Sequence, residues 1–461
     1  MRATSPTKSP WSNRWRAGAA TLAALALMSA CGGGGSGGVE PPLTCSQADQ
    51  KVWLRSYMND WYFWYQDSPN PAPDSSPTLE SYFDALKYTG ANPTFPFADR
   101  WSYATSKVAY DRTFGEGKTL GYGLMVAGLE VTGQPDQPLY ARYVEPDSPA
   151  AQAGLRRGDR ILTINGRSAR DVIATNDFGA LAADEVGQTL TLDIRDGGGD
   201  FRVTLTSAIY ALDPVPDTAL VTTPSGRKMG YVMVKDMIDQ ALTPFDAAFA
   251  QFKAAGIQEV VLDLRYNGGG LVSVADKLAS YPNRSATAGE VFASLLYNDR
   301  KSSNNQAFRF QSYANATGLS KVYVLTGPRT CSASEQVINA LRPFVNVVTI
   351  GDTTCGKPVG FLPQFDGCSS VYSVVNFESV NADNQGRYFD GFDATCPVAE
   401  DFSQPLGSPD DPLLIAASDH ADGFGCPAVA ANAKTRILGL RKPADRPRWT
   451  EPGERGGMLI R

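Results

Sequence analysis

"KVYVLTGPRTCSASEQVINAL", residues 321–341, decides the fold class of this chain. Its apolar start predicts a buried strand, a tight loop follows, and the remainder predicts a helix. Similar apolar runs, "MGYVMV" (229–234), "EVVLDLR" (259–265) and "VNVVTIG" (345–351), alternate with helix-like segments. This alternation predicts an α/β core built on a mixed, largely parallel sheet with helices.

Three loops follow strands of this predicted core. They are "DLRYNGGG" (263–270), "TGPRTCSASE" (326–335) and "IGDTTCGKPVG" (350–360). Because functional residues gather at the C-terminal ends of strands in such layers, we expect the three loops to form one site. The second loop carries Ser332 and Ser334 at the start of a helix, where a serine is usually only an N-terminal cap.

A catalytic serine needs a base, and the chain contains a single histidine, His420. This histidine falls at the predicted end of a C-terminal helix, where a partial positive charge is favourable, so we interpret it as a helix-end residue. A lysine can act as the base when it is neutral. Burial favours that neutral form because desolvation penalises the ammonium group.

Residues 117–209 are predicted to form a separate, β-rich domain. "TLGYGLMVAGLEVT" (119–132) alternates as a strand does, and Asn165-Gly166 is a strong hairpin signal. The loop "GYGL" and the stretch "SPAAQAGLRRGDRILTINGRS" (148–168) resemble a PDZ domain. The resemblance implies that a peptide C-terminus adds as an extra strand. Its carboxylate would bind backbone N–H groups around Gly121, Tyr122, Gly123 and Leu124. Use of this domain only as a hinge or lid is the alternative.

Taken together, the motifs resemble the C-terminal processing (tail-specific) serine protease family. Ser332 opens "SASE", and Lys357 lies in "CGKPVG", 25 positions later, which is the interval that the family uses. "DLRYNGGG" matches the family's strand–turn motif, and the PDZ-like segment lies upstream as expected. The likeness covers roughly residues 45–430 and implies a protease core over residues 210–430 with an inserted PDZ-like domain.

The resemblance also assigns roles to single residues. Ser332 would attack the scissile carbonyl, while Lys357 would take its proton and later return one to the leaving amine. The oxyanion would accept hydrogen bonds from the backbone N–H groups of Ala333 and of Gly269 or Gly270. A role for Ser332 as a helix cap alone remains the alternative.

Two further positions bear on this assignment. Glu335 lies in the first turn of the helix, where capping or structural pairing is preferred over direct catalysis. Many family members place a glutamine four residues after the lysine, where it orients the amine, but this chain has Phe361. Another side chain then orients Lys357, or apolar packing by Phe361 lowers the pKa of this lysine, or activity has been lost.

The N-terminus resembles a bacterial lipoprotein signal over residues 1–30. Basic residues precede "AGAATLAALALMSA" (17–30), an apolar run that is short for a membrane span. The small residues before Cys31 resemble a lipobox, which implies cleavage after residue 30 and lipidation of Cys31. Residues 31–44 then form a Gly/Ser tether. We therefore expect a periplasmic, lipid-anchored protein of the cell envelope; an ordinary secretory signal is the alternative.

Export changes the interpretation of the six remaining cysteines. They form no CxxC pair and no cluster with histidine, so a zinc site is not expected. The serine-protease hypothesis implies neither a metal nor an organic cofactor. In an oxidising compartment their even number suggests up to three disulfides. A bridge involving Cys331 and Cys355, which flank the candidate catalytic residues, would pin the site. Unpaired buried thiols are the alternative.

The two ends of the mature chain are predicted from their patterns. Residues 45–116 are expected to form an N-terminal helical cap, with helices in "KVWLRSYMNDWYFWYQ" (51–66) and "LESYFDALKY" (79–88) whose aromatic residues pack in a core. Residues 431–461 are polar and cationic, which predicts a disordered tail. The formal net charge of −6 argues against a nucleic-acid partner.

These observations give one leading hypothesis. The chain is expected to be an exported, lipid-anchored serine endopeptidase that recognises protein or peptide C-termini and cuts with a Ser332–Lys357 dyad through an acyl-enzyme. The alternative is a catalytically silent peptide-binding scaffold of the same fold. A hydrolase of the penicillin-recognising kind would rely on "SPTK" (5–8), which lies in the removable signal, so we set it aside. The oligomeric state is not predicted.

Overall fold

The computed structural model describes residues 40–283, 287–428 and 457–460. The predicted signal peptide, Cys31, residues 31–39 of the tether and most of the predicted tail lie outside these residues. Within the described part of the chain, no helix is both long and apolar enough to cross a membrane.

The α/β core contains a six-stranded sheet in the order β10-β11-β12-β16-β17-β22. Only β10 and β11 pair antiparallel; the other neighbours are parallel, as the sequence predicts. The strands are β10 (Asp217–Thr222), β11 (Lys228–Met233), β12 (Glu259–Asp263), β16 (Lys321–Thr326), β17 (Asn346–Gly351) and β22 (Cys396–Pro397).

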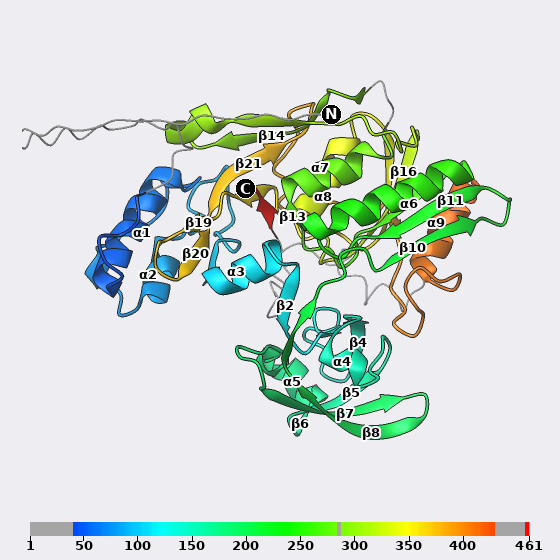
Figure 1. The fold of residues 1–461 in the computed structure, drawn as a ribbon, viewed down its shortest axis with the longest axis horizontal. Helices are drawn as coiled ribbons and strands as arrows, with labels where there is room; N and C mark the ends of the chain where they lie inside the picture. The colour runs from blue at the N-terminus through cyan, green and yellow to red at the C-terminus, as the bar shows by residue number, and fades with distance from the viewer. Residues whose placement is uncertain (1–39, 284–286, 429–456, 461) are drawn as a thin grey trace, which may run out of the picture. The chain divides into compact units, whose positions relative to one another are not determined.

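Helices cover both faces of this sheet (Figure 1). Alternate residues of a strand point to opposite faces. Val260 and Leu262 of β12 therefore join the cluster that contains α6 (Leu242–Ala255), α7 (Val272–Ser280) and α8 (Ala333–Leu341). Val261 joins a separate cluster that contains residues of α9 (Pro412–Ala421). Every residue of α8 is buried, so the helix that follows Ser332 is held on all sides.

A second six-stranded sheet has the order β13-β23-β18-β21-β14-β15 and mixes parallel with antiparallel pairs. The alternation pattern of the core did not predict it, because several of its strands are only two or three residues long. The strands are β13 (Gly270–Leu271), β14 (Val291–Tyr297), β15 (Gln306–Arg309), β18 (Val359–Phe361), β21 (Val375–Val380) and β23 (Met458–Leu459).

The N-terminal region is helical, as expected, but the first helix is shorter than predicted. Helix α1 (Gln47–Trp61) begins at its cap Ser46 and ends before residue 66, and α2 (Leu79–Leu86) and α3 (Lys107–Phe114) follow. The aromatic residues Trp53, Tyr57, Trp61 and Trp64 are at most 5% exposed, which confirms their role in the core. Strand β1 (Tyr103–Ser106) joins this region to β20 (Ser370–Ser373), which also pairs with β19 (Gln364–Phe365).

The predicted β-rich domain has its own hydrophobic core and the sheet order β3-β4-β5-β7-β8, with β6 paired to β5. Asn165 and Gly166 both have positive φ and join β5 to β6, as the hairpin signal predicts. The elements are β3 (Leu124–Val126), β4 (Leu139–Val144), α4 (Pro149–Gln152), β5 (Arg160–Ile164), β6 (Arg167–Ser168), α5 (Ala169–Thr175), β7 (Thr189–Asp196) and β8 (Gly199–Thr206).

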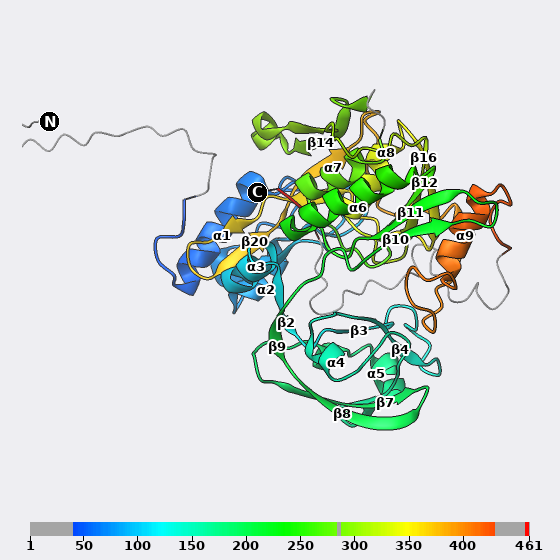
Figure 2. The same ribbon diagram turned by 45° about the vertical axis from the view of Figure 1, so that its right-hand side comes forward.

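The stretch 119–132 does not form the single strand that its alternation predicts. Strand β2 (Lys118–Gly121) pairs with β9 (Ala208–Ala211) where the chain enters and leaves the domain (Figure 2), whereas β3 pairs with β4. Gly123, with φ +77°, lies between β2 and β3. A positive φ of this kind suits glycine and breaks the extended run.

Two expectations about cysteines and the tail can be compared with the structure. Three disulfides join Cys45 to Cys368, Cys331 to Cys355, and Cys396 to Cys426, which confirms the prediction of up to three bridges. The expectation of disorder is wrong for residues 457–460, because Met458 and Leu459 form a buried strand. Their apolar side chains differ from the cationic composition on which that expectation was based.

Candidate active site

Ser332 lies in the loop between β16 and α8, immediately before the helix begins. Its φ of 61° and ψ of −112° are unusual for a residue with a side chain, and such backbone conformations cost about 1–3 kcal/mol. The residue is fully buried, and its Oγ has no hydrogen-bond partner among the described residues. Ser332 and Glu335 face each other as in a capping box, but the Ser332 hydroxyl makes no cap hydrogen bond, so it remains available to react.

Glu335 connects the backbones of the two candidate catalytic residues. Its Oε2 accepts hydrogen bonds from the backbone N–H of Ser332 at 2.9 Å and of Lys357 at 2.8 Å. Its Oε1 accepts from the Gly356 N–H at 2.8 Å and the Thr354 hydroxyl at 2.5 Å. Burial raises the pKa of Glu335, while these hydrogen bonds oppose that change. The structural pairing preferred for Glu335 from the sequence is confirmed.

A disulfide joins the same two loops. Cys331 immediately precedes Ser332, and its partner Cys355 lies two residues before Lys357. The bridge predicted near the candidate catalytic residues is thus present, and it joins the two cysteines to each other. Glu335 and this disulfide together hold the "SASE" and "CGKPVG" loops side by side.

Lys357 is buried, with 2% of its surface exposed. Burial lowers the pKa of its ammonium group from the ordinary value of 10.5 to about 7, against the opposing charges of Asp99 and Glu335. A large fraction of the side chain is therefore neutral near pH 7, which is the form that can accept a proton.

Phe361 packs directly against this amine. The Lys357 Nζ lies 3.8 Å from the centroid of the Phe361 ring, and Phe361 itself is fully buried. Phe361 contributes to the burial that lowers the lysine pKa, whereas the face of its ring attracts the ammonium form and opposes that change.

The two candidate oxyanion glycines have different surroundings. The N–H of Gly269 donates to Asn267 Oδ1 at 2.8 Å, so it is used within its own turn. The N–H of Gly270 donates to the carbonyl oxygen of Gly457. A Cβ on Gly269 would lie 2.9 Å from the Ala333 nitrogen and 2.6 Å from that carbonyl oxygen. A side chain at Gly269 would therefore collide with the Gly457 carbonyl that accepts from Gly270 N–H, and it would crowd the Ala333 nitrogen.

Asn267 orders the turn that carries these glycines. Besides accepting from Gly269, its side chain donates to the Val234 carbonyl at 2.9 Å and accepts from the Ser334 hydroxyl at 2.8 Å. Ser334 also donates to the Asn267 carbonyl. The Ser334 hydroxyl is therefore committed to hydrogen bonds within this turn, whereas the Ser332 hydroxyl has no partner among the described residues.

The residues predicted to bind a peptide terminus run from Gly121, the last residue of β2, to Leu124, the first residue of β3. Tyr122 and Gly123 use their carbonyl groups internally, accepting from Ala150 N–H and Glu145 N–H, both at 2.9 Å. Leu124 begins β3, which ends the sheet order on its side. Within the described residues, β3 thus offers an edge to which an extended peptide can add.

Contacts join this domain to the protease core beside the "SASE" loop. Glu130 forms an ion pair with Arg329, three residues before Ser332. Arg157 donates to the Tyr266 hydroxyl at 2.6 Å and pairs with Glu400 at 2.9 Å. The peptide-binding candidate and the candidate nucleophile are therefore linked by buried and half-buried polar contacts.

His420 lies in the last turn of α9, where the sequence places it. Its Nδ1 lies 3.1 Å from the Tyr323 hydroxyl, and burial lowers its pKa. Within the part of the chain that the structure describes, no hydrogen bond or ring contact joins it to Ser332, Glu335 or Lys357.

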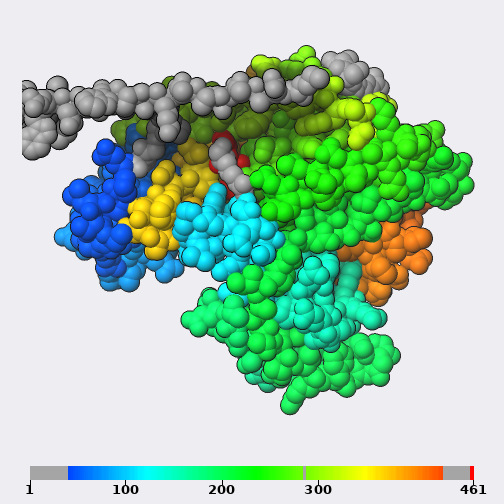
Figure 3. Space-filling view, viewed as in Figure 1, coloured from blue at the N-terminus to red at the C-terminus, as the bar shows by residue number. Residues whose placement is uncertain are grey.

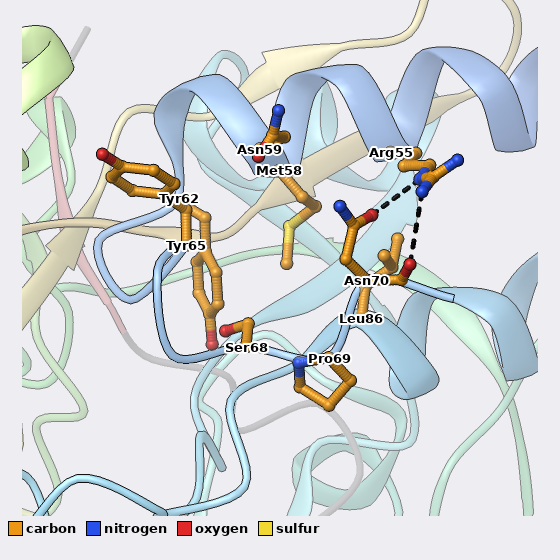
Figure 4. A pocket seen from close by; sticks show the side chains of 9 residues that line it. All are labelled: Arg55, Met58, Asn59, Tyr62, Tyr65, Ser68, Pro69, Asn70 and Leu86. Atoms are coloured by element: carbon orange, nitrogen blue, oxygen red, sulfur yellow. Dashed lines mark hydrogen bonds between the residues drawn. The ribbon is translucent and has the colours of Figure 1, made fainter. Parts of the chain in front are cut away.

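A pocket on the N-terminal region contains none of these residues (Figure 4). It lies between α1 and the chain before α2, where Arg55 donates to Asn70 Oδ1 at 2.6 Å. Its serine, Ser68, donates to the Trp64 carbonyl at 2.9 Å. Its polar groups serve local structure, so it does not compete as a catalytic site.

Sequence reasoning missed two contributors. Asp99 is buried and accepts from the Tyr62 hydroxyl at 2.6 Å, and its charge opposes the lowering of the Lys357 pKa. Gly457 brings a carbonyl group to Gly270 from the far end of the chain. Neither residue lies in a recognisable motif, and both reach the site only through tertiary packing.

Comparison with known proteins agrees with this architecture. Residues 228–384 match the model of peptidase family S41, residues 140–196 that of a PDZ domain, and residues 49–103 that of the peptidase S41 N-terminal domain. A crystal structure of a putative S41 protease from Bacteroides fragilis superposes with a TM-score of 0.64 at 27% identity, covering 81% of this chain and 97% of that chain.

Two curated relatives are named as C-terminal processing proteases. The carboxyl-terminal-processing protease of Picosynechococcus sp. is 28% identical over 263 residues, which are 55% of this chain and 59% of the relative. The carboxy-terminal processing protease CtpA of Bacillus subtilis is 26% identical over 230 residues, 50% of this chain and 46% of the relative. The chain spans about half the length of these relatives. Its three matched regions, in this order and on this fold, show that the chain belongs to peptidase family S41, with an S41 N-terminal domain and a PDZ domain.

Proposed function

We propose that this chain is a serine endopeptidase in which Ser332 is the nucleophile and Lys357 the general base. The observation that carries the proposal is the buried amine of Lys357, with a pKa of about 7, tied through Glu335 to the backbone of a serine whose hydroxyl has no partner among the described residues. A serine hydroxyl becomes an effective nucleophile when such a base can take its proton.

The reaction follows from these groups. Ser332 Oγ adds to the scissile carbonyl carbon as Lys357 takes its proton, and Ala333 N–H and Gly270 N–H stabilise the negative oxygen. Lys357 then protonates the leaving amine, which gives an acyl-enzyme. Water, deprotonated by the neutral lysine, hydrolyses the ester and restores Ser332. Each fixed oxyanion donor contributes on the order of 3 kcal/mol in the transition state.

The PDZ domain is proposed to select substrates by their C-termini, through the loop Gly121–Leu124 and the edge of β3. The names of the relatives, carboxyl-terminal-processing proteases, support the same substrate class. The chain is further proposed to be exported and lipid-anchored at Cys31 on the periplasmic side of the membrane. Three disulfides support an oxidising compartment.

Hydrolysis of an unfolded protein with an apolar C-terminal tail tests the catalytic proposal. The wild type should cleave it, Ser332→Ala and Lys357→Ala should bind it without cleavage, and His420→Ala should cleave it normally. Binding without cleavage by the wild type would favour the alternative of a silent peptide-binding scaffold. Incorporation of labelled palmitate by the wild type, and not by Cys31→Ala, tests the anchor.

A further inference from the structure

The residues Gly457–Ile460, named the docked segment here, form a strand inside the candidate active site. Strand β23 lies between β13 and β18 and pairs parallel with both. Figure 1 shows this short red strand beside β13. On the other side, the Ile460 N–H donates to the Phe361 carbonyl at 3.1 Å. The segment is thus held by backbone contacts on both edges, as an extended peptide is held when it adds to a sheet.

The docked segment presents an internal peptide bond to Gly270 N–H, one of the two proposed oxyanion donors. The carbonyl oxygen of Gly457 accepts the hydrogen bond of Gly270 N–H. The same oxygen lies in the space above Gly269 that also contains the Ala333 nitrogen. This carbonyl belongs to the Gly457–Met458 bond, so the group in the oxyanion position is a cleavable amide.

The cleft is shaped to this segment. A Cβ on Gly269 would lie 2.6 Å from the Gly457 oxygen, which is closer than real Cβ atoms come, so this glycine leaves room for the segment. A Cβ on Gly360 would lie 2.3 Å from the Phe377 ring and 2.7 Å from the Met458 oxygen, so Gly360 admits both that ring and the segment. Met458 and Leu459 are at most 1% exposed, and Gln336 Nε2 donates to the Met458 sulfur at 3.4 Å. In Figure 3 the red atoms of this segment lie in a recess of the surface.

From this geometry we infer that the docked segment is an intramolecular substrate, cut by Ser332 at the Gly457–Met458 bond. The inference rests on the proposed function. Ser332 Oγ bonds to the Gly457 carbonyl carbon, its proton passes to Lys357, and the bond to the Met458 nitrogen breaks as that nitrogen takes the proton. Water then hydrolyses the ester. The products are a chain that ends in the Gly457 carboxylate and a peptide that begins with the amino group of Met458.

The docked segment also defines the sequence that the cleft accepts. A Cβ on Gly457 would lie 3.2 Å from the Phe361 ring, the ring that packs on the Lys357 amine, so a small residue fits before the cut. The side chain after the cut is enclosed, as the full burial of Met458 shows. This site therefore cuts peptides that have glycine or another small residue before the cleaved bond and an unbranched apolar side chain, such as that of methionine, after it.

The experiment compares the intact masses of the purified 461-residue chain and its Ser332→Ala variant, which share any N-terminal processing. The wild type should lack residues 458–461, and the Ser332→Ala chain should retain them. Wild type mixed into the Ser332→Ala protein should leave that chain uncut, because the buried segment is cut within its own molecule. Hydrolysis of an unfolded protein is measured on the same samples.

A charged variant of the segment provides the second arm. Met458→Asp places a carboxylate at a fully buried position, so it should slow self-cleavage about tenfold or more and leave hydrolysis of the added protein intact. Phe424→Asp, at a side chain that is 75% exposed, is the matched control and should cut itself like the wild type.

The outcomes distinguish a failure of self-cleavage from a failure of the proposed peptidase function. A wild type that hydrolyses the added protein but keeps residues 458–461 overturns self-cleavage and leaves the proposed function standing. If the wild type stays uncut and Met458→Asp hydrolyses the added protein faster than the wild type, self-cleavage is also overturned, because the docked segment is then an inhibitor. A wild type that cuts neither the added protein nor itself overturns both proposals.

Discussion

Replacement of Lys357 by methionine should stabilise the folded chain near neutral pH, and the gain should disappear toward pH 10.5. The folded state holds the amine at a pKa of about 7, whereas the unfolded chain returns it to 10.5. Between these values the unfolded state binds one more proton than the folded state, so the stability of the wild type rises with pH. Methionine fills a similar volume and carries no proton.

The magnitude follows from the same two values. The difference between 10.5 and about 7 corresponds to about 5 kcal/mol, at about 1.36 kcal/mol per pH unit. At pH 7, where half of the folded lysine is neutral, about 4 kcal/mol of that penalty applies. At pH 10 only about 1 kcal/mol remains. The advantage of Lys357→Met should therefore shrink by about 3 kcal/mol between pH 7 and pH 10.

Urea unfolding of both proteins with their disulfides intact, at pH 7, 8, 9 and 10, measures this change. Any pH-independent effect of the substitution, such as a lost contact of the amine, cancels from the difference. A stability gap that stays constant from pH 7 to pH 10 would refute the argument, because the lysine would then titrate alike in both states. In the wild type, kcat/KM should rise with pH through about 7 and level off above it, since the free enzyme needs the neutral amine.

Three further predictions concern Glu335, the Cys331–Cys355 bridge and His420. Glu335→Gln should cost about 3 kcal/mol in urea unfolding, because an amide nitrogen replaces an oxygen that accepts buried backbone N–H groups; an unchanged midpoint would contradict this. Replacement of both Cys331 and Cys355 by serine should lower the free energy of unfolding by about 3.5 kcal/mol, because the variant loses a crosslink that spans 24 positions. Equal stability of the reduced and the oxidised wild type would contradict this. His420→Ala should keep full peptidase activity, and a loss with retained folding would restore a histidine mechanism.

The α/β core and the PDZ domain could be predicted because their signals are local. Each strand such as β12 or β16 is a continuous apolar run, and the Asn165-Gly166 turn depends on two adjacent residues. The loops that follow parallel strands necessarily meet at one edge of a sheet. For this reason the pairing of the "SASE" and "CGKPVG" loops was accessible before the structure.

The rest of the site depends on contacts between distant residues. Strands of two or three residues, such as β13 and β18, have no period to detect, and Met458 joins them only after the core exists. Burial of Asp99 beside Lys357 also reflects packing of the N-terminal region on the core. Composition predicted disorder for the segment around Met458 because a few apolar residues near arginines and prolines carry little weight in an average.

The catalytic groups and the disulfide are parts of one energetic arrangement. The positive φ of Ser332 and the burial of Lys357 both destabilise the folded state, by about 1–3 kcal/mol and about 4 kcal/mol at pH 7. The Cys331–Cys355 bridge offsets about 3.5 kcal/mol of this cost by restricting the unfolded chain between the same two loops. Because that bridge persists only in an oxidising compartment, the export proposed from the N-terminal sequence and the strained dyad proposed from the structure support each other.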